Sequence, residues 1–242
     1  MPRTRLGMLT PSSNTVVEPV TTDIIRALPD VTAHFARFTV TEISLTQQAL
    51  DQFTPEPFLQ AAQQLADARM HVIAWNGTSA AWKGFDQDDA LCGSIREQFG
   101  VPATASMQAL NAILDATEVR RFALVTPYID AVQEHIVTNY MAAGYTIAAE
   151  RHIGISENFA FSEIPGADIA DMVRAVAVEQ PEAIMIVCTN LNSAQLVDEL
   201  ERELQIPIYD SLSAVVWHAL KLAGVDPAPI TGWGRLFQRQ IL

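Results

Sequence analysis

The chain contains an internal repeat, and this repeat constrains its fold more than any other feature of the sequence. Three short segments recur in the same order: RLGMLTPSSN (5–14) as RFALVTPYID (121–130), GTS (77–79) as CTN (188–190), and VPATAS (101–106) as IPIYDS (206–211). The copies are separated by 116, 111 and 105 residues. Chance could supply one such match, but three in the same order indicate that one half duplicates the other.

Each half has the pattern of an α/β unit, because short apolar runs alternate with longer amphipathic segments. We predict two pseudo-symmetric Rossmann-like (flavodoxin-like) halves, each a parallel sheet flanked by helices. The first half is expected to comprise residues 1–104 with 210–242, and the second residues 105–209. Ligands of such sheets bind beyond the carboxyl ends of the strands, so the repeated strand-end motifs should line one cleft between the halves.

The elements follow from the apolar periodicity. Strands are expected at Arg5–Leu9, His34–Val40, Val72–Trp75, Phe122–Val125, Thr146–Glu150, Ile184–Val187 and Ile206–Tyr209. Helices are expected at Thr15–Leu28, Pro55–Ala68, Leu91–Phe99, Ser106–Ala116, Ile129–Ala143, Gly166–Glu179, Ser193–Leu204 and Ser211–Ala223.

The composition argues against several classes of protein. A net charge of −13 without a basic run argues against nucleic-acid binding. No apolar stretch approaches the roughly 20 residues that span a bilayer, and no signal peptide opens the chain. The two cysteines, Cys92 and Cys188, are expected to be reduced in a cytoplasm, with Cys92 structural. We therefore expect a cytoplasmic protein with no membrane partner.

Metal and nucleotide sites are not expected either. The five histidines show no ligand spacing, although His135 could approach the cleft. Neither a dinucleotide fingerprint nor a phosphate-binding loop occurs. The chemistry should therefore need no metal and no cofactor.

Cys188 is the strongest candidate for a catalytic residue. It follows the apolar run 183–187 and precedes Thr189 and Asn190, which places the thiol at a strand end, where a following helix N-terminus would favour the thiolate. A buried cysteine is more often an inert core residue, but the position at a strand end favours a catalytic role here. Its repeat counterpart is Gly77, so one thiol should face an open cradle rather than a second thiol.

Polar groups at the other strand ends are the expected partners of an oxyanion or carboxylate. Gly77, Thr78 and Ser79 combine close backbone approach with two hydroxyls. Tyr128 can donate from its phenol, although a packed tyrosine is equally consistent with its segment. The first strand is followed by four further candidates, Pro11, Ser12, Ser13 and Asn14, of which Ser13 or Asn14 could instead only cap a helix.

In this order, the motifs GMLTPSSNTVVEP, WNGTSAAW, TPYID, GISEN and VCTN resemble the aspartate/glutamate racemase superfamily, within it the maleate cis-trans isomerase and arylmalonate decarboxylase branch. The resemblance covers essentially the full length. It implies that Asn14, Tyr128 and Asn158 hold substrate carboxylates, and that Cys188 is the second of the superfamily's paired cysteines. Gly77 stands where racemases and maleate isomerases carry the first. This departure is similar to arylmalonate decarboxylase, in which a single cysteine protonates an enediolate.

The leading hypothesis is therefore cofactor-independent decarboxylation of a small malonate-like acid. Thr78, Ser79, Tyr128 and the amide after Cys188 would stabilise the enediolate, and Cys188 would deliver the proton. Isomerisation or racemisation with one cysteine is an alternative that Asn14 and Asn158 favour. A catabolic enzyme of other chemistry and a non-catalytic dicarboxylate-binding protein also stay open. A homodimer is common among the similar proteins, and the substrate pocket is expected to involve Val40, Ile43, Leu45 and the segment Ile155–Phe161.

Overall fold

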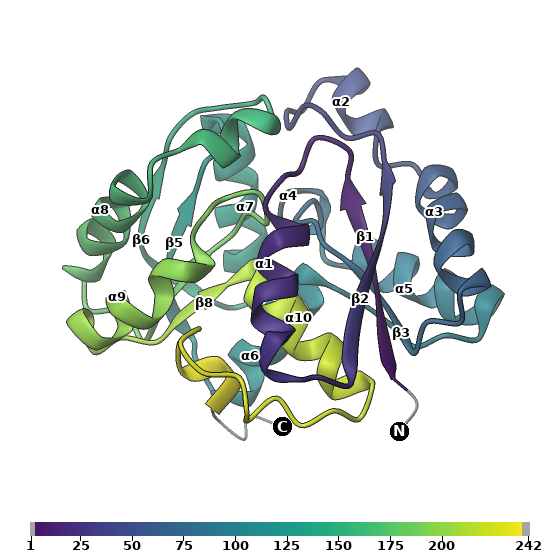
Figure 1. Ribbon diagram of the computed structural model, residues 1–242. Helices are drawn as coiled ribbons and strands as arrows, with labels where there is room; N and C mark the ends of the chain where they lie inside the picture. The colour runs from purple at the N-terminus through teal and green to yellow at the C-terminus, as the bar shows by residue number, and fades with distance from the viewer. Residues whose placement is uncertain (1–2, 239–242) are drawn as a thin grey trace.

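The structure is a computed structural model that describes residues 3–238, and it contains two four-stranded parallel sheets (Figure 1). The first sheet has the order β2-β1-β3-β4, with β1 at Thr4–Pro11, β2 at Val31–Phe38, β3 at Val72–Trp75 and β4 at Ala103–Ala105. The second has the order β6-β5-β7-β8, with β5 at Arg121–Thr126, β6 at Thr146–His152, β7 at Ala183–Ile186 and β8 at Ile208–Asp210. The two sheets share one strand order, which confirms the predicted fold class of two similar α/β halves.

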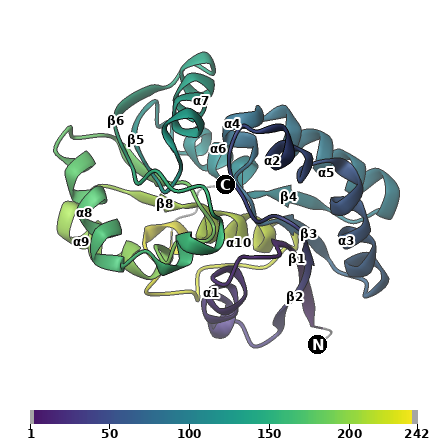
Figure 2. The ribbon, with the colours of Figure 1, turned by 90° about the horizontal axis from the view of Figure 1, so that it is seen from above.

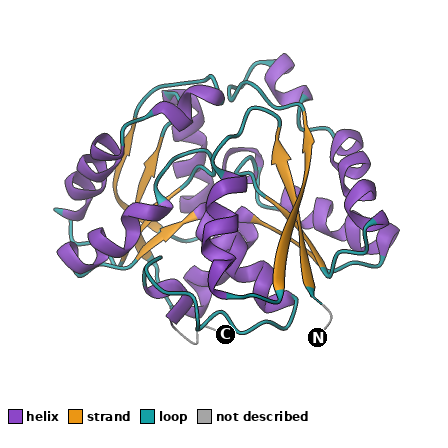
Figure 3. Ribbon diagram, viewed as in Figure 1, coloured by secondary structure: helices purple, strands orange, loops and turns teal. Residues whose placement is uncertain are grey.

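The central strands show why the sequence folds in this way. All four residues of β3 and all four of β7 are buried, as expected for parallel strands covered by helices on both faces. The edge strand β6 is mostly half-buried. The arrowheads of β1 and β2 in the first sheet and of β5 in the second point to the top of the view in Figure 1 and Figure 3, so the carboxyl ends of these strands lie on one side of the molecule.

Ten α-helices surround the sheets in the described residues. They are α1 (Val17–Ile24), α2 (Gln47–Asp51), α3 (Pro55–Asp67), α4 (Ala80–Lys83), α5 (Asp86–Phe99), α6 (Ser106–Ala116), α7 (Asp130–Ala142), α8 (Gly166–Ala177), α9 (Val197–Leu204) and α10 (Ser211–Leu222). Short 3₁₀ turns occur at Ile25–Ala27, Phe159–Glu163, Ala194–Leu196 and Arg235–Gln238.

Helices α6 and α10 lie where the halves meet (Figure 2). Helix α10 follows the second sheet and packs both on α6 and on β3 and β4 of the first sheet. Nearly every residue of α10 is buried, and Asp210 caps it by accepting hydrogen bonds from the backbone N–H groups of Leu212 and Ser213 at 3.0 and 2.9 Å. The predicted half boundaries after residues 104 and 209 stay a prediction.

The element bounds differ from expectation in places with a clear physical cause. Strand β4 is missing from the expected set because it is short and consists of two alanines around a threonine, and alanine is uncommon in strands, whereas the equally short β8 contains Ile208 and Tyr209. The helix expected at Thr15–Leu28 is shorter, since it tightens into the 3₁₀ turn after Ile24. The helix expected to begin at Ser193 starts as a 3₁₀ turn, and α9 begins only at Val197.

None of the helices in the described part of the chain is long and apolar enough to cross a membrane.

Candidate active site

A small cavity of about 20 Å³ lies at the carboxyl ends of the strands, between the two halves. Eight of the twelve predicted site residues line it: Pro11, Gly77, Thr78, Ser79, Tyr128, Asn158, Cys188 and Thr189. Its walls also include Val40 and Ile43, as expected, and three aromatic residues that the sequence analysis did not single out, Phe53, Trp75 and Trp82. The repeat therefore brings its strand-end motifs together at one place.

Cys188 follows β7 and is 3 % exposed. Burial raises the pKa of its thiol to about 12, and the charge of Asp210 acts in the same direction. Hydrogen bonds from the backbone N–H groups of Asn190 and Leu191 and from the Tyr128 hydroxyl lower the pKa, but less than burial raises it. The expectation that a helix N-terminus favours the thiolate was wrong, because α9 begins nine residues further on and desolvation dominates. The group in the cavity is a neutral thiol.

Tyr128 joins the two halves beside this thiol. Its hydroxyl oxygen lies 2.6 Å from the hydroxyl oxygen of Thr78, and it hydrogen-bonds the sulfur of Cys188. The side chain is 2 % exposed, and burial followed by the proximity of Cys188 raises the pKa of its phenol well above the usual value. The phenol of Tyr128 therefore contacts both the Thr78 hydroxyl and the Cys188 thiol.

Gly77 leaves no space for a side chain. A Cβ atom built at this position would lie 2.0 Å from Cζ2 of Trp75 and 2.4 Å from its Cε2. Real carbon atoms do not approach so closely, so the indole occupies the space into which a side chain at position 77 would extend. With the Trp75 indole in this place, only glycine fits at position 77, the repeat counterpart of Cys188.

Thr189 lies in the contact between the halves as well as in the cavity wall. Its hydroxyl donates to the backbone oxygen of Asn76 at 3.0 Å and accepts a long hydrogen bond of 3.4 Å from Nδ2 of Asn14. These bonds connect the loop after β7 to the loops after β3 and β1. The loop that carries Cys188 is thus held in place by residues of the other half.

Four predicted site residues, Ser12, Ser13, Asn14 and Asn190, do not line the cavity. Oδ1 of Asn14 accepts hydrogen bonds from the backbone N–H groups of Val16 and Val17, both at 2.9 Å, so this residue caps the start of α1. The hydroxyl of Ser13 donates to the backbone oxygen of Val40 at 2.7 Å, and Ser12 contacts the same residue.

Asn190 and Asn158 also form hydrogen bonds between loops. Oδ1 of Asn190 accepts from the backbone N–H of Thr15 at 3.0 Å, and its Nδ2 donates to the backbone oxygen of Asn158 at 2.6 Å. Nδ2 of Asn158 donates to the hydroxyl of Ser13 at 2.7 Å. This network ties the loop after β1 to the second half and positions Asn158 in the cavity wall.

Two buried indoles supply donors that the sequence analysis missed. Trp82 is 4 % exposed, packs edge-to-face on Tyr128 at 5.2 Å, and its Nε1 has no hydrogen-bond partner among the described residues. The same is true of Nε1 of Trp75, which is 1 % exposed. Both flank the GTS motif in WNGTSAAW, but only packing could show that they border the cavity.

Other candidates lie elsewhere. His135 is exposed on α7 and does not line the cavity. Cys92 is fully buried in α5, where burial raises the pKa of its thiol well above the usual value, and both cysteines are free. Leu45 does not line the cavity. Phe161 does not line it either, and its ring packs edge-to-face on that of Tyr128 with centroids 5.5 Å apart. Within residues 3–238, no group of three or more His, Cys, Asp or Glu side chains could hold a metal ion.

Comparisons with known proteins show which family the chain resembles. Residues 6–237 match the profile of a family described as arylmalonate decarboxylase. The arylmalonate decarboxylase of Bordetella bronchiseptica is 32 % identical over 197 residues, which cover 80 % of this chain and 82 % of that protein. The maleate isomerase of Nocardia farcinica is 27 % identical over 244 residues, covering 97 % of this chain and 96 % of that protein.

Solved structures of both kinds of enzyme share the fold. The maleate isomerase of Pseudomonas putida S16 superposes with a TM-score of 0.89 at 20 % identity and covers 99 % of both chains. A liganded double variant of arylmalonate decarboxylase, with cysteine in place of a glycine and serine in place of a cysteine, superposes with a TM-score of 0.84 at 26 % identity, covering 97 % of this chain and 98 % of that one.

Proposed function

This chain belongs to the arylmalonate decarboxylase family, and we propose that it decarboxylates a small malonate-like dicarboxylic acid without a cofactor, with Cys188 as the proton donor. The observation that carries the proposal is the pairing of one neutral thiol with a thiol-free cradle. Cys188 is the cysteine that lines the cavity, and its pKa of about 12 keeps it protonated at neutral pH.

In the proposed reaction, hydroxyl groups stabilise the intermediate and the thiol supplies the proton. The bond between the α-carbon and one carboxylate breaks, carbon dioxide leaves, and the electron pair delocalises into the remaining carboxylate as an enediolate. The Thr78 and Tyr128 hydroxyls, whose oxygens are 2.6 Å apart, can donate to that developing charge. Cys188 then gives its proton to the α-carbon, and the thiolate left behind recovers a proton from water.

The neutral state of the thiol suits this role. A thiol that ionised at neutral pH could act as a nucleophile but would have no proton to give. Burial keeps Cys188 protonated before the reaction, because it disfavours the charged thiolate. Once formed, such a basic thiolate takes up a proton readily, so the enzyme returns to its starting state.

The unpaired donors at the cavity support a carboxylate ligand. A buried indole N–H can only donate, and Nε1 of Trp82 has no acceptor within the described structure. A carboxylate in the cavity would provide one. Ser79 and Asn158 also line the space.

Isomerisation with one cysteine is the second candidate, favoured by the full-length match to the Nocardia farcinica maleate isomerase. A structure of that enzyme holds a covalently bound succinylcysteine intermediate. The two reactions differ in an observable way, because isomerisation releases no carbon dioxide. The glycine at position 77, where the repeat would place a second thiol, favours decarboxylation.

The test replaces Cys188 by Ser and follows carbon dioxide release from methylmalonic and phenylmalonic acids. We expect turnover to fall by roughly 10²–10⁴-fold, the usual contribution of a positioned acid, while binding of the acid is retained. Cys92→Ser is the matched control and should leave turnover unchanged, since Cys92 does not line the cavity. Undiminished turnover in Cys188→Ser would contradict the role of the thiol.

The homodimer and the cytoplasmic location expected from the sequence remain part of this proposal. Gel filtration and cell fractionation would test them.

A further inference from the structure

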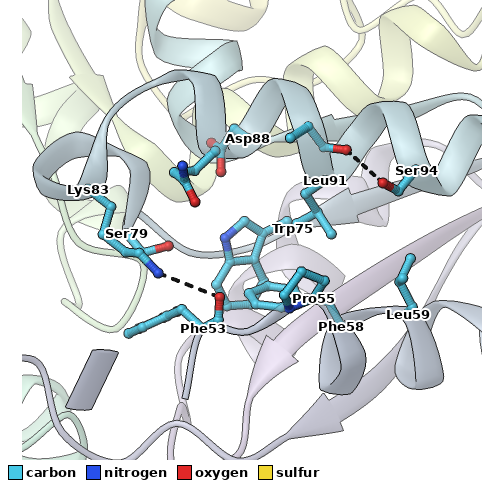
Figure 4. A pocket seen from close by; sticks show the side chains of 12 residues that line it. Phe53, Pro55, Phe58, Leu59, Trp75, Ser79, Lys83, Asp88, Leu91 and Ser94 are labelled. Carbon is cyan, nitrogen blue, oxygen red and sulfur yellow. Dashed lines mark hydrogen bonds between the residues drawn. The ribbon is translucent and has the colours of Figure 1, made fainter. Parts of the chain in front are cut away.

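A second cavity of about 120 Å³ lies directly beside the active site (Figure 4). Its walls come from Phe53, from α3 with Phe58 and Leu59, and from α5 with Asp88 and Leu91. Trp75 closes it on the side of the active site and lines both cavities. In size it approaches the engineered cavity of about 150 Å³ in another protein that binds benzene, so it can hold an aromatic ring.

The active-site cavity is much too small for the proposed substrate. Its volume of about 20 Å³ accommodates roughly one water molecule, whereas any dicarboxylic acid is several times larger. Some side chain in its wall must therefore move when substrate binds. Protein interiors are close-packed, so the side chain that moves needs a neighbouring empty space.

Three residues line both cavities: Phe53, Trp75 and Ser79. Ser79 is too small to free much space. Phe53 and Trp75 both pack on other rings, Phe53 on Trp82 and Trp75 on Phe38 at 5.1 Å between centroids, but none of the three atoms nearest to a Cβ at Gly77 belongs to Phe53. Trp75 is the large side chain that directly covers Gly77, with Cζ2 at 2.0 Å from the position of a Cβ there.

The surroundings of Trp75 are suited to such a movement. The indole already packs edge-to-face on Phe58, a wall of the second cavity, with centroids 4.7 Å apart. Its Nε1 has no partner in the described structure, and neither has Oδ2 of Asp88, which is 2 % exposed in the wall of the same cavity. Two residues with an unpaired buried polar atom thus line one empty space, into which the indole can shift.

We propose that Trp75 is a specificity-determining gate: its indole moves from Gly77 into the second cavity, and the space it vacates receives the substituent on the α-carbon of the substrate. This inference rests on the proposed function for the identity of the substrate but not for the movement itself. Acids with a larger α-substituent depend more strongly on the movement.

The test fills the second cavity from its far side with Leu91→Trp, a residue that does not line the active site. Gln98→Trp is the matched control, because it lies on the same helix α5 and is exposed. Two quantities are measured: the rate at which iodoacetamide alkylates Cys188, identified by mass spectrometry, and kcat/KM for methylmalonic and phenylmalonic acids. Thermal melts establish that each variant is folded, and Leu91→Phe replaces Leu91→Trp if the latter is not.

We expect Leu91→Trp to slow alkylation of Cys188 at least tenfold and to lower kcat/KM more for phenylmalonic than for methylmalonic acid, with Gln98→Trp unchanged. Trp75→Leu should accelerate alkylation, and adding Leu91→Trp to it should then have no further effect. The proposal would be contradicted if Leu91→Trp did not slow alkylation of Cys188, or if it slowed alkylation equally in the wild type and in Trp75→Leu. The alkylation rate can be measured without any turnover of substrate. The experiment therefore distinguishes a failure of the gate from a failure of the proposed decarboxylation.

Discussion

The hydroxyl oxygens of Thr78 and Tyr128 lie 2.6 Å apart, although the two residues belong to different halves of the chain. Thr78 follows β3 of the first sheet, and Tyr128 follows β5 of the second. Neither half contains the complete cradle, so the site depends on how the halves pack against each other. This contact also brings the phenol to the sulfur of Cys188.

Replacing Tyr128 by Phe removes one donor from the cradle while the ring keeps its packing on Trp82 and Phe161. We expect kcat to fall about 10²–10³-fold, the usual cost of losing one donor to a developing oxyanion. Steady-state kinetics with phenylmalonic acid measures this loss. Thr78→Val is the companion variant, and a normal kcat in both would show that the hydroxyl pair does not stabilise the enediolate.

The pH dependence of activity should reflect the protonation of Cys188. The thiol must be protonated to act, and burial raises its pKa from 9.0 to about 12. Activity that depends on this group is therefore constant below the raised pKa and is lost only as the pH rises toward it. We expect kcat/KM to show no decrease from Cys188 near pH 9. A decrease centred there in the wild type that persists in Cys92→Ser would contradict the assignment of the proton donor's environment.

Gly77→Ala should destabilise the protein, because the added methyl would meet the indole of Trp75 at 2.0 Å. Overpacking of a filled interior costs about 1–3 kcal/mol. Urea denaturation measures the change in the free energy of unfolding. The paired variant Trp75→Leu with Gly77→Ala provides the control: if the clash is the cause, Gly77→Ala should cost much less in the Trp75→Leu background. An equal cost in both backgrounds would point to another cause.

Asp88 should make stability depend on pH. Burial raises the pKa of its carboxyl from 3.8 to about 8, against hydrogen bonds from the backbone N–H groups of Met107 and Gln108. Between these two values the unfolded chain loses this proton while the folded chain keeps it. Rising pH therefore favours unfolding, and stability falls from about pH 4 to about pH 8.

Asp88→Asn removes this dependence and keeps an oxygen that can accept the bonds at the start of α6. We expect the variant to gain stability over the wild type progressively across that pH range, by a few kcal/mol at the upper end. Thermal melts at about pH 4 and about pH 8 provide the measurement. A difference between variant and wild type that is the same at both pH values would show that Asp88 is ionised in the folded protein.

Much of the fold was predictable from the repeat and the periodicity. Two similar halves with parallel sheets follow from three recurring strand-end segments, and seven of the eight strands were expected close to their positions. Strand β4 was missed because it is short and contains two alanines, which are uncommon in strands. Strand ends of parallel sheets meet at one edge, so the convergence of Gly77, Tyr128 and Cys188 could also be predicted.

The sequence alone indicated that the strand-end motifs meet at one cleft, because topology places strand ends irrespective of side-chain detail. It also determined that Cys188 has a glycine as its counterpart. Only the tertiary structure decided what these groups do. The side chains of Ser13, Asn14 and Asn190 hold loops together, because nearby backbone groups require partners. Burial makes Cys188 a neutral thiol, and the indole of Trp75 fills the space over Gly77, since desolvation and close packing arise only when the two halves meet.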